Sequence, residues 1–306
     1  PLMKRPFHSN AFIDLNHDGN ADLFVINDHT TIEIWKNLGQ EHDYGTGMHF
    51  EHAVDIEIPE CNKSSHCEIG QAAFADFNMD KREDVIIPVC YDVQCSNQSF
   101  LFASVSDLFN KGHFTQINKH TGNRWIFDVP SKTDLEKPNL YTPLTPRVGD
   151  INLDGYPDIL LRMKDNLLPV PDYKTQLFLN IPWTDTDDSP SPTGRGFMMQ
   201  EEVMDSVNST TMATFFDIYE DGMNDIITVQ KFESGIHRVG AFKNQLIKSS
   251  DAFFAKIIVL TGTCYQDTCS DDMFDTEGFF KSPFGKVPYG TNIPGQQISY
   301  QAQILQ

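Results

Sequence analysis

The chain has 306 residues, of which 40% are hydrophobic, and carries a formal net charge of −20 at pH 7. A chain of this length and composition can bury a sizeable core. A surface this acidic argues against nucleic acid or an anionic membrane as the partner, because phosphate groups would be repelled.

An aspartate-rich segment of nine residues occurs four times along the chain, each time between two apolar runs. The copies are DLNHDGNAD (14–22), DFNMDKRED (76–84), DINLDGYPD (150–158) and DIYEDGMND (217–225). They recur at intervals of roughly 60–75 residues, which indicates an array of similar units.

We expect β-strands on both sides of each loop. The runs before the loops are AFI, AAFA, PRVG and ATFF, and those after them are ADLFVIN, DVIIPVC, PDILLRM and NDIITVQ. A third set follows as TIEIWKN, SFLFASV, TQLFLNI and HRVGAFKN, with KIIVL near residue 260. Helical periodicity is nearly absent. Repeated units of several strands are typical of a β-propeller, so the sequence predicts an all-β fold of four such blades.

The spacing inside each loop predicts a calcium site. Oxygen atoms from positions 1, 3, 5 and 9 and a backbone carbonyl at position 7 can surround one hard cation, and glycine at position 6 permits the sharp turn. The ligands of the first loop are Asp14, Asn16, Asp18 and Asp22 with the Asn20 carbonyl. Those of the third are Asp150, Asn152, Asp154 and Asp158 with the Tyr156 carbonyl.

The second and fourth loops depart from this pattern. The second keeps Asp76, Asn78, Asp80 and Asp84 with the Arg82 carbonyl. Its position 6 is Lys81, which predicts backbone strain and a positive charge near the ion. In the fourth loop Tyr219 occupies position 3, so only Asp217, Asp221 and Asp225 remain. The alternative for all four loops is an ordinary Asp/Asn turn, but a carboxylate at position 9 of every copy favours calcium.

Six cysteines form three close pairs in the sequence: Cys61 with Cys67, Cys90 with Cys95, and Cys264 with Cys269. This clustering favours three local disulfides over a zinc site or free thiols, since no C-x-x-C spacing is present. Asn-x-Ser/Thr sequons for glycosylation occur at Asn62, Asn97 and Asn208. Together these features predict an oxidising compartment.

The sequence has no G-x-S-x-G, phosphate-loop or H-E-x-x-H motif. His49 and His52 are interpreted as surface residues, and His17 at loop position 4 is expected to point away from the ion. The segment Pro182–Gly196 is expected to be a solvated insertion between strands. Aspartates held ionised by calcium are poorly suited to act as general acids.

The loops resemble the FG-GAP repeat of integrin-α propellers. The segments AFIDLNHDGNADLF, GQAAFADFNMD, GDINLDGYPDIL and ATFFDIYEDGMNDI further resemble, in this order, the T-cell immunomodulatory protein family, also called linkin or integrin-α FG-GAP repeat-containing protein 1. That resemblance implies a type I, single-pass cell-surface glycoprotein with a seven-bladed propeller, a further β-rich region and a membrane anchor. It implies that residues 1–262 hold the last four blades. Residues 263–306 would be a disulfide-bearing connector and the start of a C-terminal β-rich domain.

The sequence contains neither a signal peptide nor an apolar stretch of about 20 residues, so we expect a fragment of a longer surface or secreted protein. Four blades of seven would leave two open flanks, which predicts self-association or pairing with further blades. The favoured function is a calcium-stabilised, non-catalytic module that binds a surface protein in adhesion or immune-cell modulation. The alternatives are a lectin that uses Trp35, Trp125 or Trp183, and a propeller-scaffold hydrolase or lyase.

Overall fold

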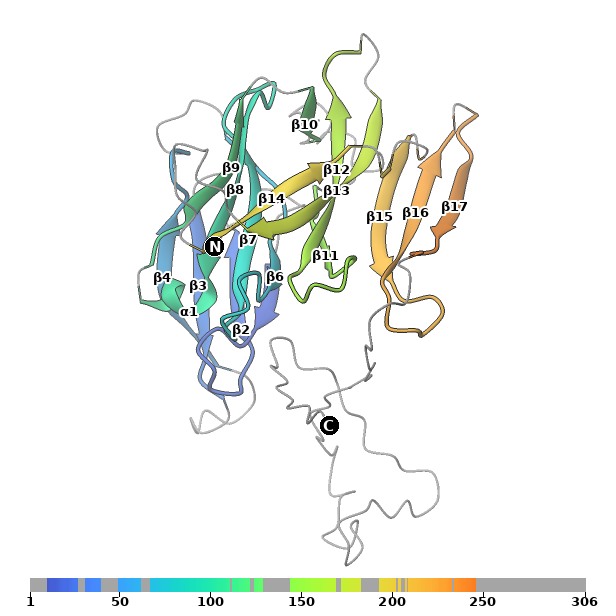
Figure 1. Cartoon of the computed structure of the whole chain (residues 1–306). Coiled ribbons are helices and arrows are strands. Elements are labelled where there is room, and N and C mark those ends of the chain that lie inside the picture. Colours follow the sequence, from blue (N-terminus) through green and yellow to red (C-terminus); the bar gives the residue numbers. More distant parts are fainter. Residues whose placement is uncertain are drawn as a thin grey trace, which may run out of the picture.

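The structure is a computed structural model of the chain (Figure 1). It describes residues 10–26, 31–39, 49–61, 67–110, 112–121, 124–128, 144–168, 172–182, 193–201, 203–204, 207, 209–232 and 234–245. The predicted Cys264–Cys269 disulfide, the sequons at Asn62 and Asn208, Trp183 and the domain boundary at residue 262 all lie outside these residues.

Four antiparallel sheets follow one another along the chain. The first contains β1 (Asn10–Ile13), β2 (Asp22–Ile26), β3 (Thr31–Asn37) and β4 (Phe50–Glu57), paired in chain order. The second has the order β5-β7-β8-β9, and β6 also pairs with β7. Its strands are β5 (Glu68–Ile69), β6 (Ala73–Ala75), β7 (Asp84–Cys90), β8 (Asn97–Ser104) and β9 (Thr115–Thr121).

The third sheet has the order β10-β12-β13-β14, with β11 also paired with β12. Its strands are β10 (Trp125–Phe127), β11 (Arg147–Gly149), β12 (Asp158–Asp165), β13 (Tyr173–Pro182) and β14 (Arg195–Gln200). The fourth sheet contains β15 (Thr210–Phe216), β16 (Asp225–Lys231) and β17 (His237–Phe242). In the described part of the chain it therefore has three strands.

Each acidic loop joins the first strand of a loop hairpin to the second: β1 to β2, β6 to β7, β11 to β12, and β15 to β16. The three predicted sets of strands are confirmed, apart from KIIVL, which lies outside the described residues. Two boundaries differ from the prediction. Within the predicted strand SFLFASV, β8 ends at Ser104, and Val105 begins the short helix α1 (Val105–Phe109). Both ends of the predicted insertion Pro182–Gly196 lie in strands instead: Pro182 ends β13 and pairs with Arg195 of β14, and Gly196 pairs with Ile181.

Three apolar cores lie between successive sheets. Phe24, Ile34, Val85 and Leu101 belong to the core shared by the first and second sheets. A second core joins the second and third sheets, with Phe100 edge-on to Phe178 at a centroid distance of 5.7 Å. The third core joins the third sheet to the fourth, which lie side by side in Figure 1. The second and third sheets lie between two cores, and β7 of the second sheet, with a core on each face, is buried at every residue.

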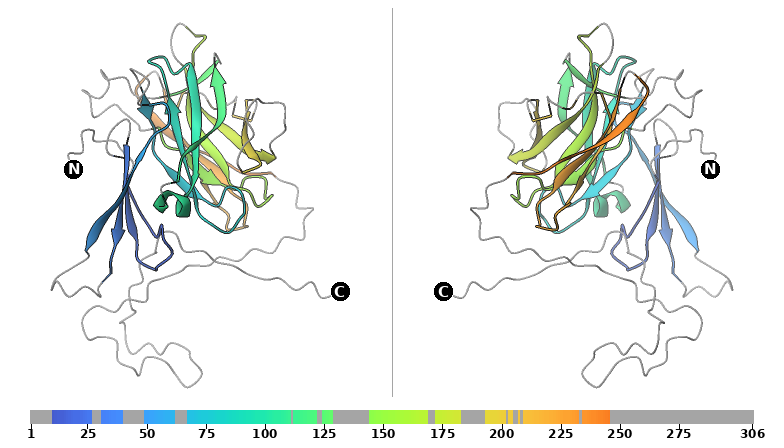
Figure 2. Two further views of the ribbon diagram at one scale, coloured as in Figure 1. Left: turned by 90° about the vertical axis from the view of Figure 1, so that its left-hand side faces the viewer. Right: turned by 90° about the vertical axis from the view of Figure 1, so that its right-hand side faces the viewer.

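A glycine permits a close approach between the third and fourth sheets. A Cβ atom on Gly149 of β11 would lie 2.7 Å from the ring of Phe215 on β15, so only glycine lets the two strands pack this closely. Successive antiparallel sheets packed face to face, seen from two sides in Figure 2, form an all-β, propeller-like arrangement. The predicted fold class is confirmed. No helix among the described residues is long and apolar enough to span a bilayer.

Candidate metal centres

The first aspartate of each loop is bound by the backbone of the same loop. Asp14 Oδ1 accepts a hydrogen bond from the Asp18 N–H at 3.1 Å, and its Oδ2 accepts one from the Gly19 N–H at 2.9 Å. Asp76, Asp150 and Asp217 make the same two contacts in their loops. The same nine-residue spacing therefore gives the same hydrogen-bonded turn in all four loops.

The aspartates at position 9 anchor the loops to the sheets. Asp22, Asp84, Asp158 and Asp225 are all buried, and each accepts a hydrogen bond from the N–H of loop position 2 at 3.0–3.1 Å. In three loops the other carboxylate oxygen accepts the backbone N–H of an asparagine that lies within, at the end of, or just after the strand that follows the loop hairpin. These asparagines are Asn37, Asn180 and Asn244, at 2.8–2.9 Å.

The second loop lacks this asparagine. In the register of β7 and β8, Val105 takes the corresponding place, and its N–H donates to the Glu83 carbonyl at 2.9 Å. Asp84 Oδ1 is thus a buried oxygen with no hydrogen-bond partner among the described residues. Burial raises the pKa of Asp84 to about 8, and the carboxylates of Asp80 and Asp76 add to this rise.

Burial likewise raises the pKa of Asp158 to about 6, in spite of the hydrogen bonds from Asn180 and Ile151. It also raises the pKa of Asp22. A raised pKa means that ionising these carboxyls inside the fold costs free energy. A cation beside them would offset that cost, so the position-9 aspartates fit a metal ion electrostatically.

Positions 3 and 5 differ among the loops. In the first three, the asparagine at position 3 donates from Nδ2 to the aspartate at position 5 at 2.9–3.2 Å. In the fourth, the Tyr219 side chain is 59% exposed, with the Lys243 ammonium 4.0 Å from the centre of its ring. Tyr219 therefore does not take the place of the asparagine amide.

Basic side chains approach position 5 in three loops. Lys36 lies 3.5 Å from Asp18, Arg82 3.2 Å from Asp80, and Lys243 3.9 Å from Asp221. In the second loop the cation that pairs with Asp80 is Arg82, whereas we predicted the positive charge near the ion at Lys81, and that assignment stays a prediction. At the strand position of Lys36 and Lys243, the third sheet has Leu179.

The donor set fits a hard cation, because all the side-chain ligands proposed for the loops are oxygen atoms. As they stand, however, the described residues contain no group of three or more His, Cys, Asp or Glu side chains arranged to hold a metal ion. The hydrogen bonds above explain this, since the aspartates turn toward backbone N–H groups of their own loops. Calcium at the four loops stays a prediction.

Positive φ angles occur at two positions of every loop. Position 4 has φ between 51° and 60° at His17, Met79, Leu153 and Glu220. Position 6 has φ of 81–88° at the three glycines and 70° at Lys81. The left-handed conformation costs a side chain with a Cβ atom about 1–2 kcal/mol, so the strain predicted for Lys81 is confirmed.

Replacing Lys81 with glycine is expected to stabilise the chain by about 1 kcal/mol, because the relieved strain exceeds the added entropy of the unfolded chain. Urea unfolding would measure the change. Arg82→Gly is the matched control, since Arg82 is exposed and has no positive φ, and it is expected to lose stability. Equal effects of the two changes would contradict this explanation.

Asparagines that sequence reasoning missed link neighbouring sheets. Asn180 Nδ2 donates to the carbonyl of Phe77, in the loop of the second sheet, at 2.8 Å. Asn244 Nδ2 donates to the carbonyl of Ile151, in the loop of the third sheet, also at 2.8 Å. The sequence signal for these asparagines is a recurring tripeptide after the loop, an aromatic residue, any residue and then asparagine: Trp-Lys-Asn, Phe-Leu-Asn and Phe-Lys-Asn. Between the first and second sheets, buried Val105 and Leu15 share an apolar core instead.

The structure also locates four of the predicted disulfide cysteines and the three histidines discussed above. Disulfides link Cys61 to Cys67 and Cys90 to Cys95, which confirms two of the three pairs. His17, His49 and His52 are exposed, as expected. His52 lies 2.7 Å from Asp55.

The sequon at Asn97 begins β8. Asn97 is partly buried, and Ser99, the third residue of the sequon, is fully buried. Its hydroxyl lies 3.2 Å from that of Tyr91. Glycosylation at Asn97 stays a prediction.

The chain has clear relatives. The FG-GAP-like repeat family model matches residues 14–87, which include the first two loops. The human T-cell immunomodulatory protein is 32% identical over 303 residues, covering 96% of this chain and 44% of the human protein. The predicted resemblance to the T-cell immunomodulatory protein family is confirmed.

More distant relatives of the same kind occur outside vertebrates. The T-cell immunomodulatory protein homolog of Plasmodium falciparum is 26% identical, covering 85% of this chain and 39% of the homolog. Protein linkin of Caenorhabditis elegans is 24% identical, covering 87% of this chain and 40% of linkin. The chain thus spans less than half the length of these curated relatives. No solved structure matches it.

Proposed function

We propose that the chain is the propeller part of a cell-surface protein that binds another protein and does not catalyse a reaction. The observation that carries this proposal is the similarity to T-cell immunomodulatory proteins along 96% of the chain. The packed succession of sheets supports it, because propeller blades form a rigid scaffold for surface loops. Adhesion or immune-cell modulation is the process that the relatives' names suggest.

Two disulfides in the described part of the chain support an extracellular location, since such bonds persist in oxidising compartments. The sequons at Asn62, Asn97 and Asn208 are compatible with the same compartment. We infer the single-pass anchor and the missing blades from the resemblance alone.

Calcium is the proposed cofactor, with a structural role. In the first three loops the carboxylates at positions 1 and 5 help to raise the pKa of the aspartate at position 9, and a divalent ion would offset this repulsion. Because only the folded loops assemble the ligands, the ion would add to the stability of the folded chain. The fourth loop, with Tyr219 at position 3, is expected to bind most weakly.

Glycan binding is the second candidate. Exposed tryptophans would support it, but Trp125 is buried, and Trp35 is partly buried with its Nε1 donating to Glu33 Oε2 at 3.0 Å. An enzyme needs an acid or base free to act on a substrate. The buried loop aspartates instead accept backbone hydrogen bonds, which supports the non-catalytic function.

Crosslinking pull-down from intact cells would test the proposed function. The chain is expected to recover a surface or secreted protein in millimolar calcium and to recover less of it in a chelator. The control is a loop variant, Asp150→Ala, in calcium. Recovery of no surface or secreted protein, or turnover of a phosphodiester or polysaccharide by the pure chain, would contradict the proposal.

A further inference from the structure

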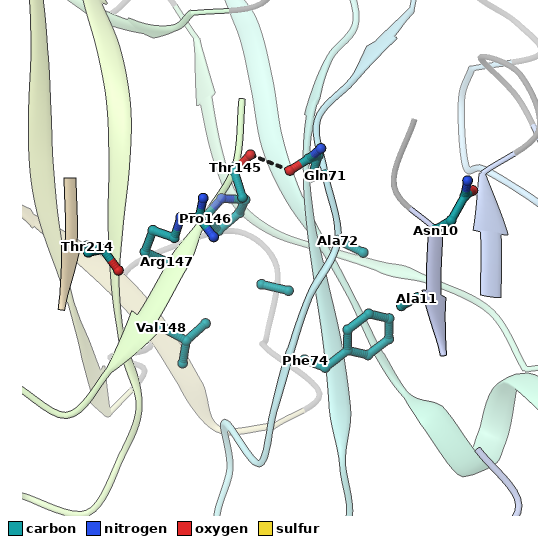
Figure 3. A pocket seen from close by; sticks show the side chains of 11 residues that line it. Asn10, Ala11, Gln71, Ala72, Phe74, Thr145, Pro146, Arg147, Val148 and Thr214 are labelled. Atoms are coloured by element: carbon teal, nitrogen blue, oxygen red, sulfur yellow. Dashed lines mark hydrogen bonds between the residues drawn. The ribbon is translucent and has the colours of Figure 1, made fainter. Parts of the chain in front are cut away.

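A hollow lies where the first strands of the four loop hairpins face one another. It has a volume of about 680 Å³, and its lining includes Asn10 of β1, Phe74 of β6, Arg147 of β11 and Thr214 of β15 (Figure 3). This volume lies within the range of small-molecule and peptide pockets. Every sheet contributes at least one residue, so the hollow is a product of the whole arrangement.

A smaller cavity of about 90 Å³ adjoins the hollow. Gln71, Thr145 and Arg147 line both spaces. The smaller cavity extends to Arg162 of β12 and Thr175 of β13. Arg147 therefore stands where the two spaces meet.

The lining of both spaces is positively charged. The chain has 43 acidic and 23 basic residues, yet no aspartate or glutamate is among the described residues that line either space. Two of the lining residues are arginines. In a chain with a net charge of −20, such a local excess favours an anionic ligand over a cationic one.

The two arginines differ in how they are held. Arg162 is largely buried, pairs with Asp128 at 2.7 Å, and has its guanidinium 4.5 Å from the ring centre of Tyr173. Arg147 is exposed, and no ion pair to it occurs within the described ranges. Within the described part of the chain, the site therefore carries one positive charge that no acidic partner offsets.

Hydrogen-bond donors supplement this charge. The Thr145 hydroxyl donates to Gln71 Oε1, as the dashed line in Figure 3 shows, which directs the acceptor atom of Gln71 to Thr145 and leaves its Nε2 as a donor. Arginine can donate two parallel hydrogen bonds to one carboxylate. A space of about 90 Å³ has room for a carboxylate group.

We propose that these adjoining spaces bind one carboxylate group of a peptide segment that lies in the hollow. The carboxylate enters the smaller cavity beside Arg147, and its single negative charge matches the single uncompensated positive charge. It belongs either to an aspartate or glutamate side chain or to a chain end. The proposal rests on the protein-binding function only in that a partner protein would carry the segment.

Titration of the purified chain with short peptides tests this site. The probes are acetyl-Gly-Ser-Glu-Ser-Gly-amide, the same peptide with glutamine in place of glutamate, and the glutamine peptide with a free chain end. Calorimetry is expected to show that at least one carboxylate peptide binds tenfold or more tightly than the neutral peptide. The tighter of the two identifies the source of the carboxylate.

Arg147→Met is expected to weaken that binding at least tenfold. Arg238→Met is the matched control, because Arg238 is an exposed arginine on β17 that lines neither space. Both variants should keep the melting temperature of the parent chain, since both side chains are exposed. Equal binding of the neutral peptide, equal effects of the two variants, or tighter binding of inorganic phosphate would overturn the proposal.

This outcome is separable from that of the pull-down. A chain that captures a surface protein but shows no preference for the carboxylate peptides would disprove this site and keep the proposed function. A chain that binds the peptides through Arg147 but captures no surface protein would support this site and disprove the proposed function.

Discussion

Replacing Asp158 with alanine is expected to lower the free energy of unfolding by about 3 kcal/mol even in a calcium chelator. Asp158 is fully buried and accepts the N–H groups of Ile151 at 3.0 Å and Asn180 at 2.9 Å. The change leaves both donors without a partner inside the fold, and each unsatisfied donor costs about 1–3 kcal/mol. Urea unfolding monitored by circular dichroism would measure the loss.

Asp154→Ala is the matched control in the same loop. Asp154 is exposed, and its hydrogen bonds to Asn152 and Tyr156 lie at the surface. In chelator it should lose less than about 1 kcal/mol. In calcium both variants should gain less stability than the parent chain, because each lacks one proposed ligand. Equal losses in chelator would show that burial of the position-9 aspartate is unimportant.

Asn180→Ala is expected to cost about 2–3 kcal/mol and to loosen the contact between the second and third sheets. The Asn180 side chain is buried, and its Nδ2 reaches the carbonyls of Phe77 at 2.8 Å and Pro157 at 3.2 Å. Its Oδ1 accepts from Arg195 Nε at 3.0 Å. Urea unfolding would give the free energy, and hydrogen exchange in β7 and β12 would report the looser contact.

Asn37→Ala tests whether the link between sheets explains that cost. Asn37 is also buried, but its Nδ2 donates to Ala21 within its own sheet at 3.0 Å. Its Oδ1 accepts the Gly39 N–H in the adjoining turn at 3.0 Å, a contact within the described segment 31–39. We expect a loss of about 1 kcal/mol. A loss as large as that of Asn180→Ala would contradict a special role for the contact between sheets.

Sequence reasoning located the strands and loops because both have local causes. Apolar runs such as DVIIPVC are strands buried on both faces, and the glycines at position 6 take the positive φ that the turn requires. The strain at Lys81 could be predicted for the same reason. Each of these features depends on a few neighbouring residues.

The contacts between sheets have no such local cause. Asn180 and its acceptor Phe77 are separated by 103 residues, so the pattern Phe-Leu-Asn gives no indication of the partner. In the second sheet the run Phe102-Ala103-Ser104 has an aromatic residue two positions before Ser104. By sequence alone Ser104 would therefore be aligned with Asn37, Asn180 and Asn244. The register pairs Val85 with Ala103, and Val105 takes that place instead. Spacing also could not show that the loop aspartates close on backbone N–H groups.

We propose that the acidic loops bind calcium and so stabilise the folded array of sheets. Equilibrium dialysis followed by elemental analysis would count the calcium ions bound to each chain, with melting curves on the same samples. We predict at least three ions, one for each loop with an asparagine at position 3, a higher melting temperature in calcium, and the loss of one ion in Asp150→Ala. A calcium content near zero with an unchanged melting temperature would contradict calcium binding by the loops.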